Sequence, residues 1–298
     1  IGAMASGHAE AQAGLPVEDA SLADVVQALA TEKATASSLT RAYLARIEAY
    51  DSAGPSLNSV RQVNPDAVAI AAGLDPVKPS ARLPLAGVPI LVKDNIATGD
   101  KQHTTAGSLA LEGAHAKEDA TVVKQLRAAG AVILGKANLT EFANIIAIDM
   151  PSGYSSLGGQ VKNPYAPALL DDRGIPVVLP GGSSSGSAAA VAAGLCTAAI
   201  GTETSGSLLS PATQNGAVTV KPTVGLISRA GILPISHSQD TAGPLTRTVR
   251  DAAILLNVLA ARDPLDPATE PLQRPDDYTT GLDKDGLKGA RIGVPSDP

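Results

Sequence analysis

Along the first 80 residues, apolar and polar positions alternate with the spacing of helices. Ser21 or Asp24 precedes a short apolar run and is suited to cap a helix there. Ser37–Ser38 would cap the next segment, in which apolar residues recur every three or four positions, at Leu39, Tyr43, Leu44 and Ile47. The pattern predicts two helices between residues 21 and 50.

From about residue 80 onward, short apolar runs of strand length alternate with helical segments. Gly87–Val92 is an apolar run that ends at Lys93, and Ala131–Leu134 is a second run. Between them, residues 120–129 have a helical pattern that Gly130 terminates. Strand, helix and strand in this order are typical of a crossover between parallel strands. We therefore expect an α/β fold whose largely parallel sheet is covered by helices.

The remaining pattern predicts a strand at Thr197–Thr202, a last helix at 247–262 and the start of another strand at Arg291–Pro295. Residues 150–180 are rich in Gly, Pro and Ser, which predicts a long surface loop. We divide the chain into a tag-like, flexible N-terminus (1–19) and one domain (20–298). Within that domain we separate a helical N-terminal segment (20–80), a catalytic core (81–262) and the start of a further C-terminal portion (263–298).

The composition excludes several classes of protein. Of the 298 residues, 44% are hydrophobic and only 17% are charged, which suits a well-buried globular chain. A net charge of −6 without a dense basic cluster argues against a nucleic-acid partner. The sequence contains no run of 18 apolar residues, so it predicts no membrane-spanning helix. The single cysteine, Cys196, excludes an intramolecular disulfide framework. The compartment stays open; we favour a cytoplasmic location over secretion.

A run of glycines and serines at residues 181–187 stands directly before an alanine-rich helical segment. Such a run can cradle an anion, expose a nucleophile or proton relay, or simply cap the helix. It lacks the Gly-Lys-Ser/Thr of a phosphate-binding loop. It does match the Gly-x-Ser-x-Gly elbow of α/β-hydrolases, behind an apolar strand at Val177–Leu179. In that interpretation Ser184 is the nucleophile, His237 the base and Glu203 a candidate acid.

Lys93 is a second candidate for chemistry, because it ends a buried strand and active sites of α/β sheets lie at strand carboxyl ends. The alternative is a lysine that reaches water or pairs with Asp94. If Lys93 is buried among hydroxyl groups instead, desolvation lowers its pKa from about 10.4 towards neutrality. A neutral lysine can act as the general base for a serine, so no histidine would be needed.

Three blocks occur in order: Gly-Val-Pro-Ile-Leu-Val-Lys-Asp-Asn-Ile at 87–96, Gly-Gly-Ser-Ser-Ser-Gly-Ser-Ala at 181–188 and Gly-Thr-Glu-Thr-Ser-Gly-Ser at 201–207. With residues 220–226 and 238–244, they resemble the amidase signature family of serine hydrolases over about residues 20–298. Within it the chain is most similar to peptide amidases, which cleave C-terminal carboxamides. The resemblance implies a large central mixed β-sheet covered by helices on both faces, in a chain that lacks the family's C-terminal part.

The resemblance also implies a Ser–cis-Ser–Lys triad that hydrolyses amides through a covalent acyl-enzyme. Ser207 would be the nucleophile, Ser183 the bridging serine in a cis peptide and Lys93 the base. Backbone N–H groups would form the oxyanion hole, at Thr204, Ser205, Gly206 and Ser207. Substrate contacts are expected at Gly182, Ser184, Tyr154 and Phe142. The substrate would be a small-molecule or peptide amide, and no metal or organic cofactor is implied.

One departure from the family pattern bears on the function, and several alternatives stay open. Residues Leu208–Leu209 stand where many relatives have an Ile-Arg pair, which argues against the transamidation subunits of the family. A transamidation subunit or a binding protein on the same core, and a His-dependent esterase using Ser184, remain the alternatives. A homodimer is compatible with the sequence.

Overall fold

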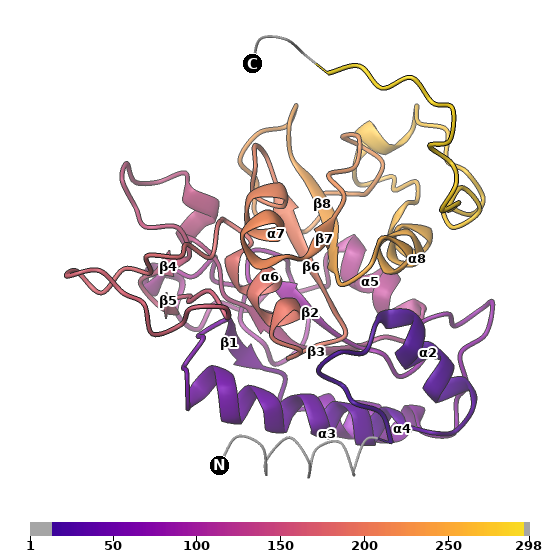
Figure 1. The fold of residues 1–298 in the computed structure, drawn as a ribbon, viewed down its shortest axis with the longest axis horizontal. Coiled ribbons are helices and arrows are strands. Elements are labelled where there is room, and N and C mark those ends of the chain that lie inside the picture. Colours follow the sequence, from indigo (N-terminus) through magenta and orange to yellow (C-terminus); the bar gives the residue numbers. More distant parts are fainter. Residues whose placement is uncertain (1–13, 295–298) are drawn as a thin grey trace.

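The computed structural model describes residues 14–294 and places one mixed β-sheet at its centre (Figure 1). The sheet has six strands in the order β1-β3-β2-β6-β8-β7. β2 is parallel to both of its neighbours, β3 and β6, whereas the three outer pairings are antiparallel. The largely parallel sheet expected from the hydrophobic pattern is therefore wrong, because the pattern shows only the β2–β3 crossover, and the mixed sheet that the resemblance implies is confirmed. The strands are β1 (Val60–Val63), β2 (Pro89–Lys93), β3 (Val132–Ala137), β6 (Ala198–Glu203), β7 (Val218–Thr219) and β8 (Thr241–Thr246).

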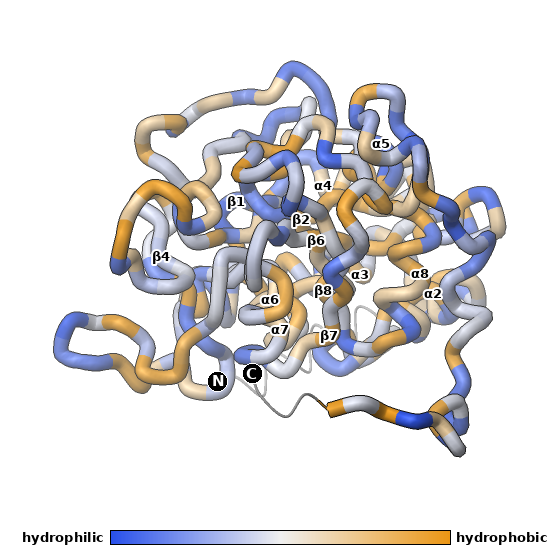
Figure 2. The backbone as a smooth tube through the Cα atoms, turned by 90° about the horizontal axis from the view of Figure 1, so that it is seen from above, coloured by the Kyte–Doolittle hydropathy of each residue, from blue (hydrophilic) through white to orange (hydrophobic). Residues whose placement is uncertain are grey.

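Helices cover both faces of this sheet, as expected. In Figure 2, α6 and α7 lie on one side of the row formed by β2, β6 and β8, and α3 and α8 lie on the other. The α-helices are α2 (Leu22–Ala30), α3 (Ala36–Arg46), α4 (Ala67–Leu74), α5 (Thr121–Ala128), α6 (Ser185–Ala192), α7 (Leu209–Asn215) and α8 (Val249–Leu259). The shorter helical segments are η1 (Ile47–Ser52), η2 (Leu109–Leu111), η3 (Glu141–Asn144) and η4 (Pro267–Thr269).

The predicted elements are largely confirmed, with two corrections near helix starts and chain ends. Ser21 caps α2, but the cap of α3 is Thr35, whose hydroxyl accepts a hydrogen bond from the Ser38 N–H at 3.1 Å. The Ser38 Oγ in turn accepts a hydrogen bond from the Thr35 N–H at 2.9 Å, so Ser38 belongs to the first turn of the helix. The strand predicted from Arg291 is wrong for residues 291–294, which find no neighbouring strand within the described chain and are exposed.

The predicted loop at 150–180 is mostly irregular and contains a short hairpin of β4 (Tyr154–Ser155) and β5 (Gly159–Gln160). The segment 20–80, expected to be helical, also contributes β1 to the central sheet. The domain boundaries stay predictions, and residues 1–13 of the N-terminal segment lie outside the described residues. No helix among residues 14–294 is long and apolar enough to cross a bilayer.

Gly186 of α6 packs against the backbone of Ser59, just before β1, and of Asn138, just after β3. A Cβ atom there would lie 2.2 Å from the Ser59 carbonyl oxygen and 2.5 Å from that of Asn138. We expect Gly186→Ala to lower the free energy of unfolding by about 2 kcal/mol or more, since backbone must shift. Gly73→Ala in α4, where a Cβ has open space, is the matched control and is expected to be neutral or slightly stabilising. Urea denaturation of both variants measures the difference; equal midpoints would contradict it.

Candidate active site

Lys93 is the last residue of β2 and is completely buried. Its side chain turns towards groups of two other segments instead of water. The Nζ atom lies 2.7 Å from the Ser183 Oγ, 2.9 Å from the Thr202 Oγ1 and 3.4 Å from the Thr202 carbonyl oxygen. The parallel pairing of β2 with β6 brings Thr202 to this place. Lys93 is therefore held among hydroxyl groups.

The alternative of a lysine paired with its neighbour Asp94 is wrong. The Asp94 carboxylate is buried and forms an ion pair with Arg61, with 2.6 Å between Oδ2 and Nε. It also accepts hydrogen bonds from Thr105 and from the Gly107 N–H. Asp94 thus anchors the segment after β2, while Lys93 points elsewhere.

Burial lowers the pKa of Lys93 from 10.5 to about 7, because desolvation penalises the charged ammonium. The negative charges of Glu203 and Asp240 oppose this shift and only partly offset it. A substantial fraction of Lys93 is consequently neutral near pH 7. A neutral amine has two N–H donors and one lone pair. Thr202 offers two acceptors, its carbonyl and its hydroxyl oxygen, so the lone pair is left for the Ser183 hydroxyl proton.

The peptide bond between Gly182 and Ser183 is cis, as the family resemblance implies. Residue 207 lies alongside this segment, because the Ser184 N–H donates to the Ser207 carbonyl at 3.1 Å. Both serines are buried, with Ser183 1% exposed and Ser207 8% exposed. Within residues 14–294 the structure records no hydrogen bond between the two hydroxyls, so the step between them stays a prediction.

The features needed for the α/β-hydrolase elbow are missing around Ser184. No strand precedes it at 177–179, and Val177 and Leu179 are exposed. Ser184 itself is fully buried, donating to the Thr202 carbonyl at 3.0 Å and accepting from the Thr202 N–H at 3.2 Å. These bonds tie the start of α6 to β6. His237, the expected base, is exposed on the loop before β8.

The turn after β6 carries the predicted oxyanion donors. Gly206 has φ of 84° and open space around it, and Ser205 is exposed. Burial raises the pKa of the Glu203 carboxyl, but hydrogen bonds from the N–H groups of Leu209, Leu208 and Gly206 outweigh it, so the net pKa is lowered. The Leu208 and Leu209 N–H groups donate to the Glu203 carboxylate at 2.7 Å and 2.9 Å. The N–H groups of Thr204, Ser205, Gly206 and Ser207 stay the predicted oxyanion donors.

Two side chains hold this turn from outside. The Asp240 carboxylate accepts a hydrogen bond from the Thr204 Oγ1 at 2.5 Å, and the Lys221 Nζ donates to the Thr204 carbonyl at 2.7 Å. Lys221 also lies 3.5 Å from the Glu203 carboxylate. The turn is thus fixed by charged groups, including a lysine that sequence reasoning did not single out.

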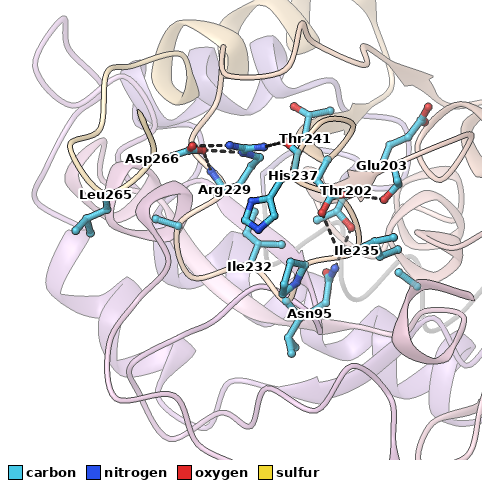
Figure 3. Close-up of a pocket in the computed structure, with 16 residues that line it drawn as sticks. Asn95, Thr202, Glu203, Arg229, Ile232, Ile235, His237, Thr241, Leu265 and Asp266 are labelled. Atoms are coloured by element: carbon cyan, nitrogen blue, oxygen red, sulfur yellow. Dashed lines mark hydrogen bonds and ion pairs between the residues drawn. The ribbon is translucent and has the colours of Figure 1, made fainter. Parts of the chain in front are cut away.

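A cavity of about 250 Å³ opens beside Thr202 and Thr204 (Figure 3). The predicted substrate residues do not line it: Tyr154 is 41% exposed on β4, Ser184 is buried, and Gly182 and Phe142 lie outside its wall. Its wall comes mainly from residues 229–241, together with Asn95, Ala143, Thr202, Glu203, Thr204, Leu265 and Asp266. The apolar Ile232–Ile235 run, next to the family-like block at 238–244, was the available signal.

One side of the cavity is closed by a charged pair. Arg229 binds Asp266 through two contacts, of 2.6 Å from Nη2 to Oδ1 and 2.8 Å from Nε to Oδ2. Among residues 14–294, no group of three or more His, Cys, Asp or Glu side chains could hold a metal ion. The candidate site instead contains the buried Lys93, whose amine can be neutral near pH 7, the two serines Ser183 and Ser207, and the turn after β6 with its N–H groups.

Comparison with known sequences and structures shows the family to which the chain belongs. The amidase family model matches residues 38–298. The chain belongs to the amidase family. A probable amidase of Arabidopsis thaliana is 46% identical to it over 285 residues, which are 93% of this chain and 53% of that protein. A component of the glutamyl-tRNA(Gln) amidotransferase of Lawsonia intracellularis is 41% identical over 278 residues, again 93% of this chain and 53% of the relative.

Solved structures agree with the amidase fold. The native peptide amidase of Stenotrophomonas maltophilia is 48% identical, with a TM-score of 0.84 over 92% of this chain and 55% of that one. An amidase family protein of Bacillus anthracis is 41% identical, with a TM-score of 0.86 over 97% of this chain and 55% of that one. This amidase family chain therefore has the family's central sheet, and it spans about half the length of the relatives it matches.

Proposed function

We propose that this amidase family chain hydrolyses carboxamides through an acyl-enzyme formed on Ser207, with Ser183 and Lys93 as its proton relay. The observation that carries the proposal is the 2.7 Å contact between the buried Lys93 Nζ and the Ser183 Oγ. A lysine in this setting is a base near pH 7. Ser183 is the hydroxyl partner of Lys93 that adjoins residue 207, because the next residue along the chain binds the Ser207 carbonyl.

The chemistry follows from these positions. As the Ser207 Oγ attacks the amide carbon, its proton passes to Ser183, whose own proton passes to Lys93. N–H groups of the 204–207 turn stabilise the tetrahedral oxyanion, each contributing about 2.7–4 kcal/mol. The relay then returns the proton to the departing nitrogen, which leaves as ammonia or an amine. Water attacks the Ser207 ester in the same way, releasing the acid and restoring Ser207.

As substrate we propose a peptide with a C-terminal carboxamide. The support is the 48% identity to the peptide amidase of Stenotrophomonas maltophilia, together with a peptide amidase structure that holds the competitive inhibitor chymostatin. Ammonia release from amino-acid amides, peptide amides and aryl amides tests the proposal. We expect peptide and aliphatic amides to react at least as well as aryl amides, and chymostatin to compete with them. Preference for aryl amides over all others would contradict it.

The proposed base also predicts how kcat/KM depends on pH. Lys93 accepts a proton only when neutral, and burial lowers its pKa to about 7. kcat/KM should therefore rise with pH through about 7 and level off above it, with one ionisation on the acidic limb. Initial rates of ammonia release at low substrate concentration, in well-buffered solutions between about pH 5 and 9, measure this profile. A limb near the ordinary lysine pKa of about 10.4 would contradict a desolvated base.

A second candidate, a transamidation subunit, is favoured by the 41% identity to the glutamyl-tRNA(Gln) amidotransferase component. Leu209 in place of an arginine argues against it. A fluorophosphonate probe separates the two functions when combined with ammonia release by the isolated chain. Labelling of Ser207 with ammonia release supports autonomous hydrolysis. Ammonia release only after partner subunits are added would support transamidation.

A further inference from the structure

Asn95 carries a buried oxygen without a hydrogen-bond partner. The side chain is 2% exposed, and its Nδ2 donates to the Thr202 Oγ1 at 3.0 Å. Its Oδ1 accepts no hydrogen bond from any residue of the described chain. Leaving a buried acceptor unpaired costs about 1–3 kcal/mol, so such an atom calls for a donor from outside the protein.

Asn95 lines the cavity beside the candidate active site, so its buried side chain borders the space that a ligand would occupy (Figure 3). The same residue also builds the cavity wall. Its carbonyl oxygen accepts the Leu233 N–H at 2.9 Å, and the next residue, Ile96, pairs with Ile232. An amide acceptor therefore stands directly against an apolar surface, formed by Ile232, Leu233, Pro234 and Ile235. The wall suits an aliphatic group with an N–H donor next to it.

Asn95 also lies next to the proton relay. Its Nδ2 shares the Thr202 Oγ1 with the Lys93 Nζ, which contacts this oxygen at 2.9 Å. In amide hydrolysis the departing nitrogen must face the relay, because it receives its proton there. A scissile amide whose nitrogen faces the relay would bring its N–H close to the Asn95 side chain, whose Oδ1 has no partner among the described residues.

We propose that the Asn95 Oδ1 accepts a hydrogen bond from the N–H of the scissile amide while the apolar wall at 232–235 packs against the substrate. Asn95 then distinguishes amides from esters, since an ester places an oxygen lone pair where the amide places its N–H. This inference rests on the proposed amide hydrolysis and adds the residue that recognises the amide. No proton is transferred to Asn95; its contribution is recognition alone.

The test compares one peptide amide with the methyl ester of the same peptide. Asn95→Leu removes the acceptor and should lower kcat/KM for the amide about 10-fold to 100-fold more than for the ester; the loss for the ester measures the missing bond to Thr202. Asn95→Asp keeps an oxygen acceptor and should retain the amide-to-ester ratio within about threefold, when measured well above the Lys93 pKa. Parallel loss of both activities in Asn95→Leu would overturn the proposal, because it would assign Asn95 to holding Lys93 through Thr202.

Asn215 provides a matched control. It too is a buried asparagine with an unpartnered Oδ1, but its Nδ2 binds the Pro180 and Pro211 carbonyls and it does not line the cavity. Asn215→Leu is expected to lower stability and leave the amide-to-ester ratio unchanged. A ratio that falls as in Asn95→Leu would overturn the assignment.

Binding separates this inference from the proposed function. If the wild-type chain hydrolyses neither substrate, the proposed hydrolysis fails, and calorimetric titration with the peptide amide and its ester still decides the role of Asn95. Tighter binding of the amide than of the ester by wild type, lost in Asn95→Leu, would support recognition by Asn95. Equal binding of both ligands by both proteins would overturn it.

Discussion

Replacing Ser207 with alanine is expected to lower kcat/KM for a peptide amide by about a million-fold, the loss typical of removing a serine nucleophile. Ser207 stands 8% exposed on the turn after β6, while the neighbouring Ser183 is 1% exposed. Of the two serines, Ser207 is the less deeply buried, and it is therefore the one that we expect to meet the amide carbonyl. Steady-state ammonia release, with mass spectrometry of the fluorophosphonate-labelled peptide, measures the effect.

Two nearby serines serve as comparisons for this prediction: Ser187 in α6 and Ser184 directly before it. Ser187 is also buried and donates only to the Ile200 carbonyl, so Ser187→Ala is the control and should keep its activity within about threefold. Ser184→Ala tests the esterase alternative, in which this serine is the nucleophile. It removes the bonds to the Thr202 backbone and should lower stability by about 1–3 kcal/mol. A loss of turnover as large as that of Ser207→Ala would reverse the assignment.

Local patterns predicted the elements that depend on neighbours in sequence. The apolar run ending at Lys93 is a buried strand, and Gly130 ends α5 with φ of 88°. The start of α3 was predicted two residues too late, because Thr35 and Ser38 are both good caps and only the backbone geometry selects between them. The strand at 291–294 could not be judged from its own residues, since a strand needs a partner from elsewhere.

The site was predicted only as far as motifs define it. Lys93 and Ser183 were named from sequence, and the structure places them in contact. Thr202, which orients Lys93 and shares its hydroxyl with Asn95, lies more than a hundred residues further along the chain, so only the β2–β6 pairing reveals its role. The cavity wall at 229–241 was missed for the same reason: a looped segment packs against the end of β2 without any periodic pattern.

Replacing Lys93 with alanine is expected to lower kcat/KM by at least about ten-thousand-fold, since general-base assistance contributes about 10²–10⁴ and Ser183 loses its proton acceptor as well. Lys93→Arg should be as inactive, because arginine stays charged at every accessible pH and offers no lone pair. If Lys93 acts as a free base, millimolar methylamine should restore part of the activity of Lys93→Ala. Rescue should increase with pH, as the neutral amine becomes more abundant.

Lys136 supplies the matched control, because it is equally buried and burial lowers its pKa to about 8. Its Nζ donates to the Ile96 carbonyl and, at 3.0 Å, to the Thr104 Oγ1, so it supports the segment after β2 and contacts neither serine of the proposed triad. Lys136→Met should lower stability yet leave kcat/KM per folded molecule within about threefold. Equal inactivation of the Lys93 and Lys136 variants would show that removing either buried lysine disrupts this region. That result would contradict a specific role of Lys93 as the base.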